Sequence, residues 1–161
     1  MIKHRNSMNS GMSLLDKLID HNPETAIDVA YPLTDKAIAQ GLIRDVEALL
    51  NSRTSWLKLD SSLSELAGSI VGYGLPDFSS MPFSSKDGQQ YLREIVRTTL
   101  LDFEPRFKHV SVEIVSNNDN LDRILRLRIT ARYYVDNEVQ ELILDSEVEP
   151  VSLGIKLSEP V

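Results

Sequence analysis

The sequence of 161 residues predicts an α+β domain, with N-terminal helices packed on a small C-terminal antiparallel β-sheet. Two observations carry this prediction. As far as residue 103, apolar residues recur at intervals of three and four, which is the spacing of amphipathic helices. Beyond Pro105 they alternate with polar residues, which is the period of strands with one buried face. Helices followed by strands are typical of α+β domains, and the length suits a single domain.

The first expected helix, over residues 12–20, is short. Ser13 is a suitable N-cap, and an apolar face follows it, formed by Leu14, Leu15, Leu18 and Ile19. An isolated helix of this length is marginal in water, so it has to dock on its own domain or on a partner.

Three further helices are expected, over residues 35–51, 62–71 and 86–103. Each carries an apolar stripe at helical spacing, which predicts that one face of each helix is buried. For the helix over 62–71 the stripe consists of Leu63, Leu66, Ala67 and Ile70. Pro105 ends the last helix, because the residue before a proline is disfavoured in the α region.

An apolar segment, YGLPDF, separates the last two helices and consists of Tyr73, Gly74, Leu75, Pro76, Asp77 and Phe78. With Met81 and Phe83 it is too apolar for a flexible linker, so we expect an ordered loop. The favoured interpretation is structural: Gly74 and Pro76 shape a tight turn that the large side chains hold in place. The alternative is that these side chains dock on a partner.

Strands are expected over residues 110–115, 124–135 and 138–149, with a last short strand over 151–157. The second strand has a basic outer face with Arg126, Arg128 and Arg132, and the third has an acidic one. The favoured interpretation is that the two faces pair across the strands. The alternative is a polarised surface that orients a protein partner, since residues 104–135 carry a charge of +2 and residues 136–161 carry −6.

Composition excludes several classes of protein. No window approaches the roughly 18 apolar residues of a membrane span, and the first residues lack the apolar core of a signal peptide. The absence of cysteine excludes a disulfide framework and thiolate chemistry. A net charge of −7 argues against broad nucleic-acid binding, so we expect a cytoplasmic protein without direct membrane insertion.

No catalytic constellation is present. The three histidines, His4, His21 and His109, lack metal-ligand spacing, and the sequence has neither a G-x-S-x-G motif nor a phosphate-binding glycine loop. Carboxylates are abundant, but no two of them stand out as the acid and base of a glycosidase. We therefore expect no enzyme, no cofactor and no metal site.

Three stretches together, IRDVEALLNSR (43–53), YGLPDF (73–78) and DFEPRF (102–107), resemble the TssE family of type VI secretion baseplate wedge subunits. That family is related to phage-tail wedge proteins once labelled lysozyme-like. The resemblance covers about residues 12–149, with conservative departures at Val46 and Ser52. The matching positions outside YGLPDF include Arg44, Asp45, Glu47, Leu49, Leu50, Asn51, Arg53, Glu104, Pro105 and Arg106.

The resemblance implies a structural role rather than catalysis. Family members lie in the wedge with TssF and TssG, near TssK, and present a sheath-like surface on which the first TssB–TssC ring assembles. We accordingly expect a monomer in isolation that becomes one part of a larger hetero-oligomer. Two alternatives remain: the equivalent wedge protein of a phage tail or other contractile injection system, and a peptidoglycan-cleaving, lysozyme-like hydrolase.

For the functional surface, the sequence predicts protein-binding roles for Glu104, Pro105 and Arg106 and for the three arginines of strand 124–135. Glu104 and Arg106 can equally form an internal corner between helix and sheet. An exposed edge strand offers a second contact, through strand addition by a partner. The expected organisation is a flexible extension over 1–11, one wedge domain over 12–150, and a C-terminal strand or tail over 151–161.

Overall fold

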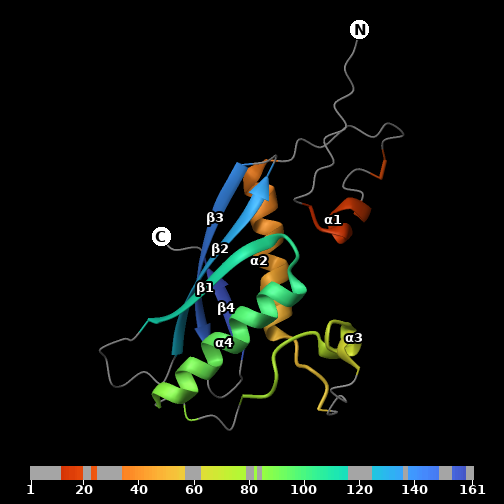
Figure 1. Ribbon diagram of the computed structural model, residues 1–161. Helices are drawn as coiled ribbons and strands as arrows, with labels where there is room; N and C mark the ends of the chain where they lie inside the picture. Colours follow the sequence, from red (N-terminus) through yellow and green to blue (C-terminus); the bar gives the residue numbers. More distant parts are fainter. Residues whose placement is uncertain are drawn as a thin grey trace.

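The chain folds into helices followed by a four-stranded antiparallel sheet, which confirms the predicted α+β class (Figure 1). The computed structural model describes residues 12–19, 23–24, 34–56, 63–78, 82, 85–115, 125–135, 138–148 and 154–158. The elements, in chain order, are α1 (Leu14–Leu18), α2 (Asp35–Asn51), α3 (Ser64–Ala67), the 3₁₀ helix η1 (Ile70–Gly72), α4 (Lys86–Phe103), β1 (Phe107–Val115), β2 (Leu125–Val135), β3 (Glu138–Val148) and β4 (Ile155–Ser158).

The two long helices have the predicted bounds, because local signals fix both of their ends. The Thr34 side chain accepts a hydrogen bond from the Ala37 N–H at the start of α2, and Ser85 accepts one from the Gly88 N–H at the start of α4. Helix α4 ends at Phe103 because Glu104, which precedes Pro105, has a non-helical ψ of 87°.

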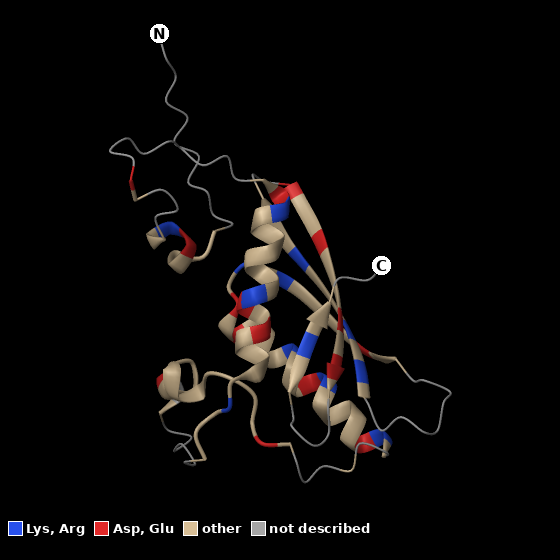
Figure 2. Cartoon of the chain, turned by 180° about the vertical axis from the view of Figure 1, so that it is seen from behind, with Lys and Arg blue, Asp and Glu red and all other residues tan. Residues whose placement is uncertain are grey.

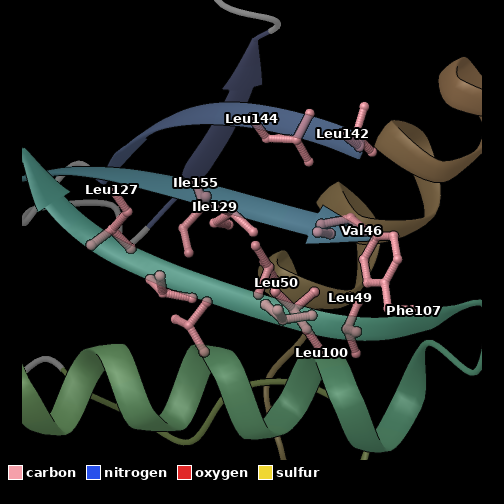
Figure 3. Packing of buried hydrophobic residues seen from close by; sticks show 14 of the residues in the cluster. Val46, Leu49, Leu50, Leu100, Phe107, Leu127, Ile129, Leu142, Leu144 and Ile155 are labelled. Atoms are coloured by element: carbon pink, nitrogen blue, oxygen red, sulfur yellow. The ribbon is translucent and has the colours of Figure 1, made fainter. Parts of the chain in front are cut away.

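The sheet has the strand order β1-β2-β3-β4, with antiparallel neighbours throughout. Helices α2 and α4 cover one face of it, and side chains from both helices meet the inward side chains of the strands (Figure 3). Strand β1 starts at Phe107, three residues before the predicted start, because Phe107 is itself buried in this core. The result is a two-layer domain, and no helix of the described part of the chain covers the second face of the sheet, which we call its open face.

Helix α1 lies beside α2 and is capped by Ser13, as predicted from its sequence. It buries no residue, and all four of its predicted apolar side chains are exposed. Among the described residues, its side chains are held to the rest of the domain through polar groups, which are described below.

The helix predicted over 62–71 is wrong in its extent and in its burial. The structure has only α3 and η1 there, separated by Gly68 and Ser69. Glycine is a poor helix former, and the Ser69 hydroxyl donates to the Leu66 carbonyl and accepts from the Val71 N–H, which breaks the helix. The apolar residues Leu63, Leu66 and Ile70 are exposed rather than buried.

Several sequence expectations fall outside the described residues. These are the extension over 1–11, the side chains of Met81 and Phe83, and the part of the last strand over 151–153. In the part of the chain that the structure does describe, no helix has both the length and the apolar character needed to cross a membrane.

Candidate functional site

Glu104 and Arg106 form the corner between α4 and β1, on either side of the exposed Pro105. The Arg106 guanidinium donates from Nε to Glu104 Oε1 at 2.6 Å and from Nη2 to Glu104 Oε2 at 2.5 Å. The backbone N–H of Arg106 also donates to Glu104 Oε1, at 3.2 Å. Only 7% of the Glu104 side chain and 14% of the Arg106 side chain are exposed. In the isolated chain this pair is therefore internal, and its use at an interface stays a prediction.

Asp45 connects this corner to the helix layer. Its Oδ2 accepts from Arg106 Nη2 at 2.7 Å, and its Oδ1 accepts from Arg44 Nη2 at 2.7 Å. Arg44 in turn donates to both carboxylate oxygens of Asp16 on α1, at 2.7 and 3.2 Å. Opposite charges thus alternate along five residues, which we call the charge row: Glu104, Arg106, Asp45, Arg44 and Asp16.

Within the charge row, hydrogen bonds shift the pKa values of Arg106, Arg44 and Asp16. For Arg106, burial alone lowers the pKa, but hydrogen bonds to Glu104 and Asp45 outweigh it, so the pKa is raised. Hydrogen bonds to Asp16 and Asp45 raise the pKa of Arg44. The hydrogen bond from Arg44 lowers the pKa of Asp16 despite the opposing effect of its burial. These three shifts all favour the charged forms of Arg106, Arg44 and Asp16.

The YGLPDF segment packs against the end of α2. The Leu75 N–H donates to the Ser52 carbonyl at 2.9 Å, and the Thr54 N–H donates to the Leu75 carbonyl at 3.0 Å. These bonds enclose a lobe, which we define as the described residues 54–56 and 63–74 and which contains α3 and η1. Leu75 and Phe78 are fully buried, whereas Pro76 is partly buried and Asp77 exposed.

Gly74 makes this closure feasible. It has a φ of +105°, and a Cβ at this position would lie 2.6 Å from the Ser52 carbonyl carbon and oxygen. On either side of it, the Tyr73 ring packs edge-on against Phe103, with centroids 5.5 Å apart, and the Arg53 guanidinium lies 5.0 Å from the centre of the Phe78 ring. Arg53 also donates to the Leu50 carbonyl at the C-terminus of α2, at 3.1 Å. The geometry favours the structural interpretation of this segment.

The open face of the sheet carries the strand charges. Three cross-strand ion pairs span β2 and β3: Arg126–Glu147, Arg128–Asp145 and Arg132–Glu141, with N–O distances of 3.1, 2.7 and 3.1 Å. The prediction of cross-strand pairing is confirmed. The three arginines belong to β2 and the three carboxylates to β3, so a basic row lies beside an acidic row and the charges of each pair compensate one another. Figure 2 shows the basic and acidic positions along the backbone of the strands. The part that these arginines play in partner binding stays a prediction.

The edges of the sheet differ in how far they are covered. Strand β4 pairs only with the segment of β3 from Asp145 to Val148. Within the described part of the chain, the preceding segment of β3, residues 138–144, has β2 on one side and no strand on the other. Its outward side chains include Val139 and Ile143, which are 56% and 36% exposed.

Asn51 has a role that depends on a residue far along the chain. Its Nδ2 donates to the Ile155 carbonyl at 2.8 Å, and its Oδ1 accepts from the Ile155 N–H at 2.9 Å. The side chain thus pairs with β4 as a neighbouring strand would and fixes that edge strand to α2. The resemblance described above includes Asn51 as a matching position, but the neighbouring residues in the sequence do not indicate that its partner is Ile155.

The carboxylates of the corner are held by ion pairs. Two of its carboxylates, Glu104 and Asp45, bind the same guanidinium, so neither is the free acid or base that hydrolysis needs. Across the described residues, no group of three or more His, Asp or Glu side chains is arranged to hold a metal ion.

Comparison with known proteins gives two similarities. A family model described as baseplate wedge protein gp25 matches residues 36–138. A chain in the solved structure titled "The baseplate complex from the type VI secretion system" is 18% identical, with a TM-score of 0.47, over 71% of this chain and 96% of that chain. Among curated proteins, nothing matches the sequence.

Proposed function

The chain belongs to the baseplate wedge protein gp25 family, and from this premise we propose that it is a non-catalytic wedge subunit of a type VI secretion baseplate. The single observation that carries the proposal is the extent of the family match. Residues 36–138 run from α2 to the start of β3 and include most of the charge row, the lobe and the β1–β2 pair. The type VI system is favoured over a phage tail by the three TssE-like stretches of the sequence.

In this proposal the protein acts as a cytoplasmic, monomeric building block. It binds TssF and TssG, lies near TssK, and contacts the sheath proteins TssB and TssC through its β-sheet. Buried ionic contacts hold α4, β1 and α2 in one geometry, which suits a part whose surfaces have to meet several partners at fixed angles. Co-expression with TssF and TssG is the direct test, and a stable complex is the expected result.

Sheath contact is assigned to the half-covered edge of β3. A strand added by a sheath subunit along residues 138–144 would continue the line of β4 and complete the backbone hydrogen bonds there. Val139 and Ile143 would give that strand apolar contact, and the three cross-strand ion pairs would set its register.

This assignment is tested by reversing the sheet arginines. Changing Arg126, Arg128 and Arg132 to Glu should stop sheath assembly while the monomer stays folded. The matched control reverses both sides, with Glu141, Asp145 and Glu147 changed to Arg as well, which restores the three pairs in the opposite direction. Normal sheath assembly by the three-residue variant would exclude the charged face as a docking element.

The two alternative functions are separated by simple observations. Phage-tail genes next to this gene, in place of type VI genes, would indicate that the protein is the equivalent wedge subunit of a phage tail. Robust clearing of a peptidoglycan suspension by the purified protein would instead support the hydrolase, and we expect none, because Glu104 and Asp45 are committed to Arg106.

A further inference from the structure

Helix α1 is docked on the domain by charge rather than by apolar contact. None of its residues is buried, and none of its apolar side chains packs against the hydrophobic core that the described residues form. It meets α2 through the Asp16 carboxylate, which accepts from Arg44 Nη1 at 2.7 Å and from Arg44 Nη2 at 3.2 Å. Arg44 Nη2 also donates to the Ser13 hydroxyl at 3.4 Å. A helix of five residues is marginal in water, so α1 depends on these contacts for its own stability.

The position of Asp16 on α2 is shaped by Gly41 and Arg44. A Cβ at Gly41 would lie 3.1 Å from Asp16 Oδ2, closer than ordinary van der Waals contact, so the missing side chain leaves room for the carboxylate. Asp45 orients Arg44, because its Oδ1 accepts from Arg44 Nε at 3.1 Å and from Nη2 at 2.7 Å. The side chains of Arg44 and Asp16 are 46% and 21% exposed. An ion pair with this exposure is weak and is screened by salt, so the docking of α1 is easily reversed.

The net charge that Asp16 meets is set by the other four members of the charge row. By formal charge, Glu104 and Asp45 are negative and Arg106 and Arg44 are positive, so the four balance. Without Arg106 one negative charge is in excess, which repels Asp16. The charge of Arg106 does reach Asp16: the pKa of Asp16 is lowered mainly by the hydrogen bond from Arg44, and also by the charge of Arg106.

We propose that α1 is an ionic strap, docked while the corner between α4 and β1 is electrically balanced and released when the corner loses the positive charge of Arg106. Asp45 couples the two places, because one of its carboxylate oxygens accepts from Arg106 and the other from Arg44. Coupling between two sites is reciprocal, so a partner that drew Arg106 out of the row would release α1, and docked α1 would oppose that partner. The inference concerns the free chain, so its outcome does not depend on the proposed function.

The first test is the salt dependence of hydrogen exchange in the full-length chain. The Lys17 and Ile19 N–H groups donate to the Ser13 and Leu15 carbonyls, so their exchange rates report on α1. Raising the salt from about 0.01 M to about 1 M shortens the Debye length from about 30 Å to about 3 Å, and should accelerate exchange at both amides about two- to tenfold. In Asp16→Asn the two amides should exchange rapidly at both salt concentrations.

Charge variants at the corner test the sign of the coupling at low salt. Arg106→Met should accelerate exchange at the α1 amides, and Glu104→Gln should slow it. The double variant balances the row again and should return exchange to the wild-type rate. The matched control is Arg97→Met, which removes one positive charge from an exposed pair with Glu94 on α4 and should leave exchange in α1 unchanged.

Three results would overturn the inference. Exchange in the wild-type α1 that does not respond to salt would mean that contacts other than ion pairs hold it. Low-salt exchange as fast in the wild type as in Asp16→Asn would mean that α1 is not docked. Unchanged exchange in the corner variants would mean that the corner and α1 are not coupled. If Arg106→Met does not fold, Glu104→Gln decides alone, and exchange no slower than in the wild type would count against the coupling.

Discussion

Removing the Arg106 side chain should destabilise the domain more than any other single charge deletion. In Arg106→Ala the Glu104 carboxylate, 7% exposed, loses the guanidinium that donates hydrogen bonds to it and compensates its negative charge. Asp45 loses one of its two cations but keeps Arg44. The dominant cost is therefore one buried and uncompensated carboxylate.

The expected magnitude follows from that burial. Breaking a buried ion pair by removing one partner costs about 3–5 kcal/mol. For a domain of this size, each kcal/mol lowers the melting temperature by about 2–4 °C, so the variant should melt about 6–20 °C below the wild type. Arg126→Ala is the matched control. Its pair with Glu147 is exposed and worth about 0–1 kcal/mol, so its melting temperature should fall by less than about 4 °C.

The assay is thermal unfolding followed by circular dichroism, with Glu104→Gln, Arg106→Met and the double variant in a cycle. The double variant should recover much of the lost stability, because it leaves no unpaired buried charge. A melting temperature of Arg106→Ala within about 2 °C of the wild type would refute the internal corner, and so would strictly additive effects in the cycle. Binding to TssF–TssG, measured on the same variants, then separates a corner from an interface: lost binding with an unchanged melt would indicate an interface.

Three further predictions concern other parts of the domain. Gly74→Ala should lower the free energy of unfolding in urea by at least about 1–3 kcal/mol, because a Cβ at φ +105° meets the Ser52 carbonyl. Gly68→Ala should cost far less, because a Cβ added there would lie 4.0 Å from the Glu65 carbonyl oxygen. Asn51→Ala should leave the backbone N–H and carbonyl of the buried Ile155 without the Asn51 amide and lower the free energy of unfolding by about 1–3 kcal/mol. Faster hydrogen exchange should appear first in β4. Because the pKa of Asp16 is lowered in the folded chain, docking of α1 is fully stabilised above the unfolded value near 3.8 and is lost as the pH falls below it. Nuclear magnetic resonance shifts of residues 13–19 should therefore change between pH 6 and pH 3 in the wild type and not in Asp16→Asn.

The elements that the sequence predicted well are those with signals at both ends. Helices α2 and α4 combine a periodic apolar face with a capping hydroxyl, at Thr34 and Ser85, and the β2–β3 pair combines alternation with opposite charges at facing positions. The segment 62–71 has an apolar period as good as theirs, but its residues Leu63, Leu66 and Ile70 are exposed in the structure. Periodicity reports the spacing of apolar residues, and burial depends on what lies opposite them.

The sequence predicted only the local contacts of the candidate site, because its other contacts join residues that are far apart in the chain. Glu104 and Arg106 are two residues apart, so their pairing was one of two stated options. Their link to Asp45 crosses 61 positions, and the bond from Arg44 to Asp16 crosses 28. No local pattern encodes either contact. The resemblance to the TssE family marked Arg44 and Asp45 as a motif without indicating that they form one row with the corner.

The pairing of Asn51 with Ile155 also has a consequence for the order of events during synthesis. The two residues are 104 positions apart. At about 5–20 residues per second, Ile155 is added roughly 5–20 s after Asn51, which is long compared with the microseconds in which a helix such as α2 forms. Until Ile155 is added, the Asn51 amide has only the Glu47 carbonyl of its own helix as a partner, so the edge of the sheet is expected to close last. A nascent chain stalled before residue 154 should consequently lack this closure and remain more accessible to proteases at the end of α2 than the released protein.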